Sequence, residues 1–279
     1  MKAVFDSHIH LFERPYGDLF QNSHIRSGPP GELHLYEEYR KAFHITGAFV
    51  IGYEGGHCPR NNRFVEQLSG SRPWIYSFGY VPPAPKGFAA RARALLERGH
   101  FGLSCYLDCA SAEPWLASPE MRKFWELVES RRIPLNLNAS WRHCRTLSNV
   151  LADFPRCIVL LSHMARPPVT TPRSLRAYNR AMETLARHEK VYVKLSGFYA
   201  FVREGWRYPQ TGLAGAVRGL KERFGAGRLL WGSDFPPVLE HNSFAQALHL
   251  IEEGFSCFTS AELERVCRRN AEQIIKERM

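Results

Sequence analysis

Two histidines separated by one residue stand at the end of the first apolar run of the chain, where the sequence reads DSHIH. Side chains alternate along a β-strand, so His8 and His10 would point to the same side. Two imidazoles placed in this way can hold one metal ion. The sequence therefore predicts a metal-binding or proton-handling site at the end of the first strand.

Two more residues that can bind a metal ion or transfer a proton stand near the ends of later apolar runs. His163 ends the segment LSH, and Asp234 ends the segment GSD. An imidazole can bind a metal ion or polarise a carbonyl, and a carboxylate can bind the ion or take a proton from water. If all these runs are strands of one sheet, His163 and Asp234 join His8 and His10 at one edge.

The elements that must position these groups are eight short apolar runs rich in β-branched and aromatic residues. They cover residues 3–10, 45–53, 74–81, 101–108, 133–140, 157–164, 191–197 and 228–235. Segments with helical spacing lie between most of the runs, and a final helix is expected after the last one. The clearest helical segments are residues 88–98, 119–131, 174–188, 212–224 and 260–277, the last with Ser260 as its expected cap.

Alternating strands and helices indicate parallel βαβ units, and eight strands in 279 residues match a single (β/α)8 TIM barrel over residues 1–279. The competing doubly wound sheet has fewer strands and a glycine-rich first turn, which this chain lacks. In a barrel, functional side chains lie at the carboxyl ends of the strands. A long loop rich in Pro and Gly, residues 12–33, follows the first strand and is expected over the mouth.

The segments DSHIH, VLLSHM, VYVKLSG and LLWGSDFP resemble the amidohydrolase superfamily, and the resemblance spans residues 6–236. It is closest to the amidohydrolase-related branch, which includes sugar lactonases, 2-pyrone-4,6-dicarboxylate lactonase and metal-dependent decarboxylases. The resemblance implies that His8 and His10 bind a divalent metal, usually zinc. It also implies that His163 binds the metal or polarises the substrate carbonyl. Asp234 would be a metal ligand or the general base.

The fifth run departs from the family pattern. Many superfamily members have a histidine at the end of strand 5, where this chain places Asn136, Asn138 and Ser140 on one face. A neutral amide is a poorer zinc ligand than an imidazole. The fourth run also lacks the Lys or Glu that bridges two metals in binuclear members. We therefore expect one divalent metal ion, zinc by preference, or none.

Polar groups near the ends of other runs are candidates for substrate binding. A guanidinium pairs well with a carboxylate, which favours an anionic small molecule near Arg166. Tyr106, Lys194, Asn136 and Asn138 are the other candidates. The leading hypothesis is hydrolysis of a small lactone or ester that carries a carboxylate. A metal-dependent decarboxylase and a non-catalytic ligand-binding barrel are the alternatives.

The formal net charge is +10, from 37 Lys and Arg against 27 Asp and Glu. The basic residues are scattered, and no aromatic and basic stripe indicates nucleic-acid binding. Seven cysteines, an odd number without a CxxC pair, indicate a reducing compartment. No signal peptide or membrane span is recognisable. We expect a cytoplasmic protein without nucleic-acid or membrane partners, either a monomer or a homodimer.

Overall fold

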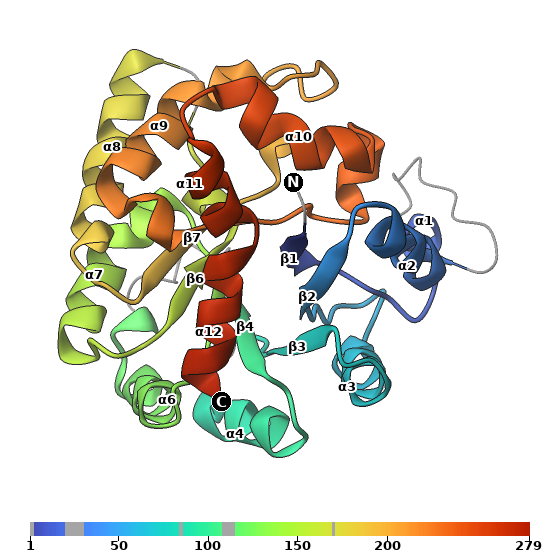
Figure 1. Ribbon diagram of the computed structural model, residues 1–279. Coiled ribbons are helices and arrows are strands. Elements are labelled where there is room, and N and C mark those ends of the chain that lie inside the picture. Colours follow the sequence, from blue (N-terminus) through green and yellow to red (C-terminus); the bar gives the residue numbers. More distant parts are fainter. Residues whose placement is uncertain (1–2, 20–30, 84–85, 108–114, 169–170) are drawn as a thin grey trace.

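The structure, a computed structural model, describes residues 3–19, 31–83, 86–107, 115–168 and 171–279. Eight strands form one sheet in sequence order, and each is parallel to the next. The predicted (β/α)8 barrel is confirmed (Figure 1). Every strand falls inside its predicted run. The strands are β1 (Val4–Ile9), β2 (Ile45–Ile51), β3 (Ile75–Tyr80), β4 (Gly102–Tyr106), β5 (Leu135–Asn138), β6 (Val159–Leu161), β7 (Val191–Leu195) and β8 (Leu229–Trp231).

The barrel closes between β1 and β8 through a short contact beyond the end of β8. A single parallel bridge joins Ile9 to Phe235. The backbone N–H of His10 donates to the carbonyl of Phe235 at 2.7 Å, and that of Asp234 donates to the carbonyl of His8 at 2.9 Å. The seam of the barrel therefore lies beside the residues predicted to do chemistry.

Helices cover the outside of the strands (Figure 1). The longer helices bury one apolar face, as in α8, where Tyr178, Met182 and Leu185 are buried at helical spacing. The helices are α1 (Tyr16–Leu19), α2 (Glu32–Ala42), α3 (Asn61–Ser71), α4 (Phe88–Glu97), α6 (Pro119–Ser130), α7 (Cys144–Asp153), α8 (Pro172–Ala186), α9 (Ala214–Phe224), α10 (Phe244–Phe255), α11 (Ser260–Glu264) and α12 (Asn270–Arg278).

Three helix starts differ from the sequence-based expectation. The helix expected from residue 212 begins at Ala214, after the short turn η4 (Thr211–Leu213). The helix expected from residue 174 begins at Pro172, because Thr171 caps it and accepts a hydrogen bond from the backbone of Ser174. The last helical region is capped by Thr259 rather than Ser260. It is also divided by a π-helical turn, η7 (Arg265–Arg269), between α11 and α12.

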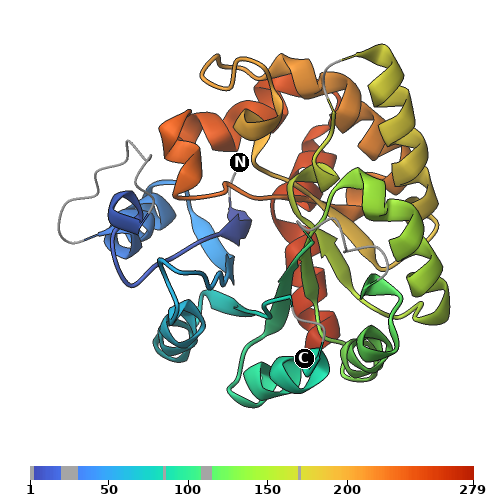
Figure 2. The same cartoon turned by 180° about the vertical axis from the view of Figure 1, so that it is seen from behind.

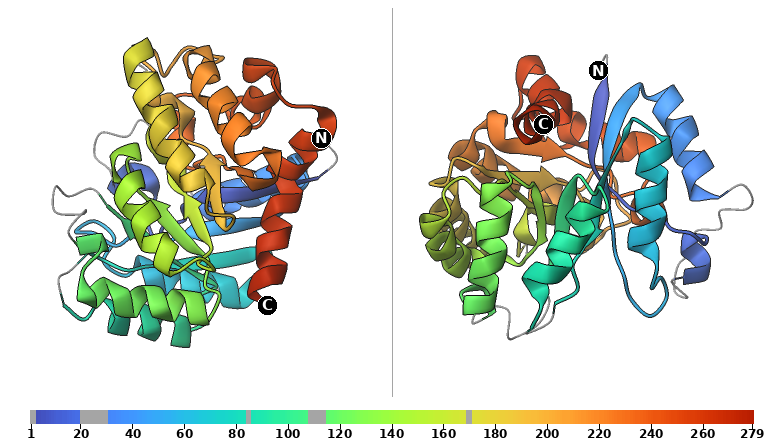
Figure 3. Two further views of the ribbon diagram at one scale, coloured as in Figure 1. Left: turned by 90° about the vertical axis from the view of Figure 1, so that its left-hand side faces the viewer. Right: turned by 90° about the horizontal axis from the view of Figure 1, so that it is seen from below.

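The C-terminal helix covers one end of the barrel. Ile274 and Ile275 of α12 belong to the same buried cluster as Phe5 and Ile158, which lie near the starts of their strands. Helix α12 (red) lies in front of the strands in Figure 1, behind them in Figure 2 and along one side of them in Figure 3. The predicted functional groups lie at the opposite end, where the strands finish. Among the described residues, no helix is both long and apolar enough to cross a membrane.

A bulge in β1 turns His8, and with it His10 directly after the strand, toward the barrel interior. Phe5 packs inside the barrel against Phe49, with ring centroids 4.8 Å apart. In a regular strand, His8 would lie on the opposite face from Phe5, because side chains alternate. The pairing of β1 with β2 shifts between Asp6 and Ile9, and this shift reverses the alternation.

Candidate active site

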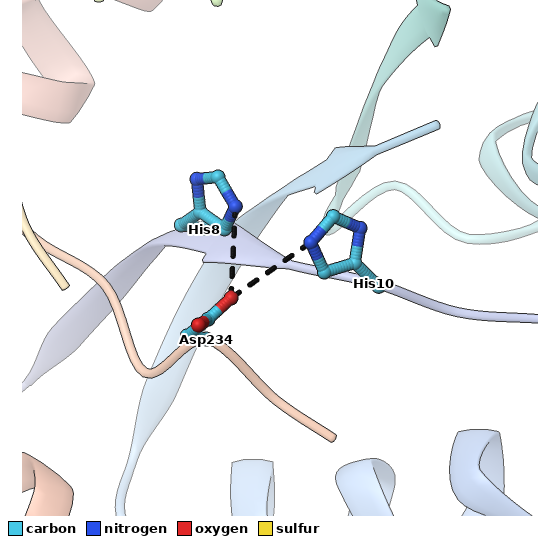
Figure 4. Close-up of side chains that lie close together, drawn as sticks. All are labelled: His8, His10 and Asp234. Atoms are coloured by element: carbon cyan, nitrogen blue, oxygen red, sulfur yellow. Dashed lines mark ion pairs between the residues drawn. The ribbon is translucent and has the colours of Figure 1, made fainter. Parts of the chain in front are cut away.

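The four groups expected to do chemistry converge at the carboxyl end of the barrel. Asp234 Oδ1 lies 3.7 Å from His8 Nε2, 3.8 Å from His10 Nε2 and 4.0 Å from His163 Nε2. His8 lies on β1, His10 directly follows it, His163 lies in the turn after β6, and Asp234 follows β8. Figure 4 shows His8 and His10 facing the carboxylate of Asp234. One carboxylate oxygen therefore faces three imidazole nitrogens.

The other ring nitrogen of each histidine contacts a different partner. His10 Nδ1 lies 2.9 Å from the carbonyl oxygen of Ile51. His163 Nδ1 lies 3.0 Å from the hydroxyl of Ser196, and His8 Nδ1 lies 3.4 Å from the amine of Lys194. His8 Nε2 is buried without a hydrogen-bond partner among the residues that the structure describes. These contacts direct all three Nε2 atoms toward Asp234.

Burial keeps the three imidazoles neutral. It lowers the pKa of His8, His10 and His163, and the charge of Lys194 lowers the pKa of His8 further. The carboxylate of Asp234 opposes this effect on His10 and His163. Neutral imidazole nitrogens carry the lone pairs that a metal ion needs.

The donor set fits a divalent metal ion. The ligand atoms of His8, His10 and Asp234 all lie within 4.8 Å of one another. Imidazole nitrogens and carboxylate oxygens are among the ligands that zinc prefers. A buried His8 Nε2 without a partner has the position and chemistry of a ligand atom. These residues can therefore hold a metal, and His163 lies beside them.

Left-handed backbone conformations shape the site on two sides. His163, Met164, Ala165 and Arg166 all have positive φ angles, from 50° to 57°, and Asp234 has a φ of 61°. Such conformations are unfavourable for residues other than glycine and are frequent at functional sites. On the His163 side, the hydroxyl of Tyr178 donates to the carbonyl of Met164 at 2.7 Å and stabilises the turn.

Asp6 joins the two strands that carry the site. Its Oδ1 accepts hydrogen bonds from the backbone N–H of His8 at 3.2 Å and of Ser233 at 2.9 Å. Its Oδ2 accepts one from the hydroxyl of Tyr36 at 3.1 Å. Burial raises the pKa of this carboxyl to about 6, although these hydrogen bonds oppose the rise. Sequence reasoning missed this role, although Asp6 belongs to the DSHIH segment.

Asn136 and Lys194 form a buried polar layer beneath the histidines. Asn136 Oδ1 accepts hydrogen bonds from Lys194 Nζ at 2.6 Å and from Ser162 at 3.0 Å, and Asn136 Nδ2 donates to Ser104 at 3.1 Å. Both side chains are fully buried, and burial lowers the pKa of Lys194 well below its usual range. They reach the site through the contact between Lys194 and His8. Their assignment to substrate binding remains a prediction.

The other predicted substrate-binding residues lie nearer the strand ends. Arg166 Nε donates to Asn138 Oδ1 at 3.1 Å. Asn138 is paired in register with Tyr106, whose ring packs against those of Tyr53 and Tyr80 at 5.5 Å and 5.4 Å. In the long loop expected after the first strand, residues 20–30 lie outside the described residues, as does residue 108 at the end of the fourth run.

Tyr199 is a further residue of the site that sequence reasoning did not select. It follows β7, and its hydroxyl donates to Asp234 Oδ2 at 2.6 Å. Burial and the neighbouring Asp234 raise the pKa of Tyr199 well above its usual range, so the hydroxyl keeps its proton. Its position just after the seventh apolar run, which contains Lys194, was the only sign of this role in the sequence.

Comparison with known proteins identifies the family. A family model described as amidohydrolase matches residues 5–276. The chain belongs to this amidohydrolase family. A curated relative, the L-fucono-1,5-lactonase of Burkholderia ambifaria, is 30% identical over 154 residues, which are 55% of this chain and 51% of that protein. The match therefore spans about half the length of the curated relative.

Solved structures share the fold over nearly the whole chain. An amidohydrolase from Burkholderia multivorans with bound zinc has a TM-score of 0.83 at 18% identity, and the match covers 98% of this chain and 99% of that one. A candidate 2-pyrone-4,6-dicarboxylic acid hydrolase from Pseudomonas putida has a TM-score of 0.76 at 20% identity. The match covers 100% of this chain and 99% of that one. At these identities the likeness shows the fold alone.

Proposed function

We propose that this amidohydrolase hydrolyses a small lactone by attack of water on its carbonyl carbon. One observation carries the proposal: Asp234 Oδ1 faces His8, His10 and His163 at the carboxyl end of the barrel. The matched relative that is a lactonase supports a cyclic ester as the substrate. The absence of a histidine from β5 favours hydrolysis over the decarboxylase alternative, which requires a tightly bound metal.

In the proposed mechanism, the Asp234 carboxylate takes the proton of the attacking water through Oδ1. His163, whose Nε2 lies 4.0 Å from the same oxygen, would stabilise the negative charge that develops on the carbonyl oxygen. Asp234 then returns the proton to the alkoxide that leaves when the ring opens. Both groups are held in place before the substrate arrives, which lowers the entropic cost of the reaction.

His8, His10 and Asp234, with His163 beside them, would hold one divalent metal ion, and zinc suits this donor set best. When bound, zinc would polarise the carbonyl of the substrate and lower the pKa of the attacking water. The protein residues contribute three neutral imidazoles and one carboxylate, so the net charge of the site with the ion is positive. A positive site favours an anionic substrate.

Arg166 and Asn138 would orient the substrate on the β5 and β6 side, and Tyr106 would cover it from the β4 side. A guanidinium matches a carboxylate or vicinal hydroxyl groups of the substrate. Asn136 and Lys194 would support His8 from below. The proposed partner is therefore a small, polar or anionic lactone, acted on by a monomer or a homodimer.

The proposal is tested by measuring proton release from a panel of aldonic 1,4- and 1,5-lactones, with L-fucono-1,5-lactone and 2-pyrone-4,6-dicarboxylate included. The variant Asp234→Asn should lower kcat by roughly 10²–10⁴-fold, the usual contribution of a general base. Asp153→Asn is the matched control, because Asp153 is exposed on α7 and pairs only with Arg122 among the described residues. Full turnover by Asp234→Asn would contradict the proposal. Release of carbon dioxide from a panel of aromatic carboxylic acids, with no lactone opened, would support the decarboxylase.

A further inference from the structure

We propose that Tyr199 is a positioning residue that acts through Asp234. Its hydroxyl donates to Asp234 Oδ2 at 2.6 Å, whereas Oδ1 of the same carboxylate faces the three histidines. The two oxygens of Asp234 therefore have different roles. Oδ2 accepts the hydrogen bond from Tyr199, and Oδ1 is available to take a proton or bind a metal.

The anchor matters because a carboxylate rotates easily about its last bond. The terminal torsion of aspartate has a broad, two-fold energy profile, so packing alone fixes its orientation poorly. A hydrogen bond to one oxygen gives the carboxylate a preferred orientation. In this site, that orientation points Oδ1 at His8 and His10 and keeps it near His163.

Tyr199 is itself held firmly. Its ring stacks on that of His241, with centroids 4.6 Å apart and an interplanar angle of 16°. The preceding residue, Phe198, is buried and packs against Phe255 at 5.3 Å between centroids. The short helical turn η3 (Phe198–Phe201) that carries Tyr199 is therefore fixed to the region around α10.

The segment that leads to Tyr199 contacts both proposed catalytic groups. The hydroxyl of Ser196 lies 3.0 Å from His163 Nδ1. A Cβ atom on Gly197 would lie 2.6 Å from the same nitrogen and 3.3 Å from Asp234 Oδ2. Residues 196–199 thus form a continuous support that orients His163 at one end and Asp234 at the other. Tyr199 supplies the hydrogen bond at the Asp234 end.

The inference rests on the proposed role of Asp234 in lactone hydrolysis, and its first test is kinetic. Tyr199→Phe removes only the hydroxyl, so kcat for L-fucono-1,5-lactone, or for the lactone that the panel shows to turn over fastest, should fall. We expect a loss of about 10- to 100-fold, typical when a partner that orients an active-site group is removed. KM should change by no more than about twofold, because substrate contacts remain.

The matched control is Tyr208→Phe. Tyr208 also donates its hydroxyl to a carboxylate, that of Glu253, but this pair is exposed and outside the site. The control should keep wild-type kinetics. In the Asp234→Asn background, Tyr199→Phe should cause no further loss, because its effect passes through the Asp234 carboxylate.

A crystal structure of Tyr199→Phe gives a readout that does not depend on activity. The Asp234 carboxylate should occupy a rotated or divided orientation in the variant. A raised KM with unchanged kcat, or an equal loss in the Asp234→Asn background, would overturn the inference. If the wild-type enzyme opens no lactone, the proposed function fails, and the crystal structure then decides: an unmoved carboxylate refutes the role of Tyr199, and a rotated one supports it.

Discussion

His10 Nδ1 lies 2.9 Å from the backbone carbonyl oxygen of Ile51, at the end of the neighbouring strand β2. A carbonyl oxygen can only accept a hydrogen bond, so Nδ1 must carry the proton. In the neutral ring, Nε2 then has a free lone pair, and this is the nitrogen that faces Asp234. The backbone of β2 therefore selects the tautomer of a histidine that directly follows β1, before any ligand binds.

This tautomer leads to a prediction about metal content. Protein purified without chelator should contain about one equivalent of zinc, as expected for one site with nitrogen and oxygen ligands. His10→Ala should lose most of it, as measured by elemental analysis. His249→Ala is the control, because His249 is half exposed on α10. Metal-free wild-type protein that is active without added ions would instead make His8 and His10 hydrogen-bond partners of the substrate.

Gly197→Ala should reduce activity more than it reduces stability. Gly197 has a φ of +63°, which costs roughly 1–2 kcal/mol for alanine. Its new Cβ would also lie 2.6 Å from His163 Nδ1, so the imidazole must move. Gly56→Ala, which meets no atom within 4 Å, is the control. Kinetics and thermal unfolding check the result, and unchanged kcat in Gly197→Ala would argue against a fixed His163.

Two exposed glycines allow a matched test of backbone conformation. Gly70 lies inside α3 and Gly99 follows α4, and a Cβ atom added to either would meet no atom within 4 Å. Of the two, only Gly99 has a positive φ, +92°. Gly70→Ala should stabilise the protein by roughly 0.5–1 kcal/mol, because alanine loses less entropy in a helix. Gly99→Ala should destabilise it by about 1 kcal/mol or more. Urea unfolding of both variants should show shifts of opposite sign.

Buried His100 should make the protein less stable in mild acid. Burial lowers its pKa from 6.5 to about 4, so the unfolded chain binds a proton here at a higher pH than the folded one. The stability that it contributes is complete above about pH 6.5 and is lost as the pH falls toward 4. Between pH 7 and pH 5 this amounts to about 2 kcal/mol.

The variant His100→Asn should weaken this pH dependence, as measured by urea unfolding at pH 7 and pH 5. The other buried histidines retain their own contribution, so a smaller slope remains. His249→Asn, at an exposed position, should behave like the wild type. An unchanged slope in His100→Asn would show that another group causes the acid sensitivity.

The strands could be predicted from the sequence because their apolar runs are short and separated by helical segments. The carboxyl ends of parallel strands meet at one end of a barrel, so His163 and Asp234 could be placed beside His8 and His10 without knowing any distance. The helix starts were less certain. Thr259 and Ser260 are adjacent residues that can both cap, and only the backbone geometry distinguishes them.

Contacts between distant residues could not be predicted in the same way. The hydrogen bond from Tyr199 to Asp234 and the bulge that turns His8 inward depend on how strands are paired and tilted, not on local patterns. The left-handed turn at His163 is another example. It contains no glycine, so its sequence carries no sign of a positive φ angle.

The seam between β1 and β8 has a consequence for protein synthesis. The hydrogen bond between Asp6 and Ser233 joins residues 227 positions apart in the chain, and the site lies across it. During translation, His8 and His10 leave the ribosome long before Asp234, so the nascent chain has the two histidines without the carboxylate that they face. The four groups of the site come together only after the last strand has been made and docked, so the proposed metal binding and hydrolysis would belong to the finished chain alone.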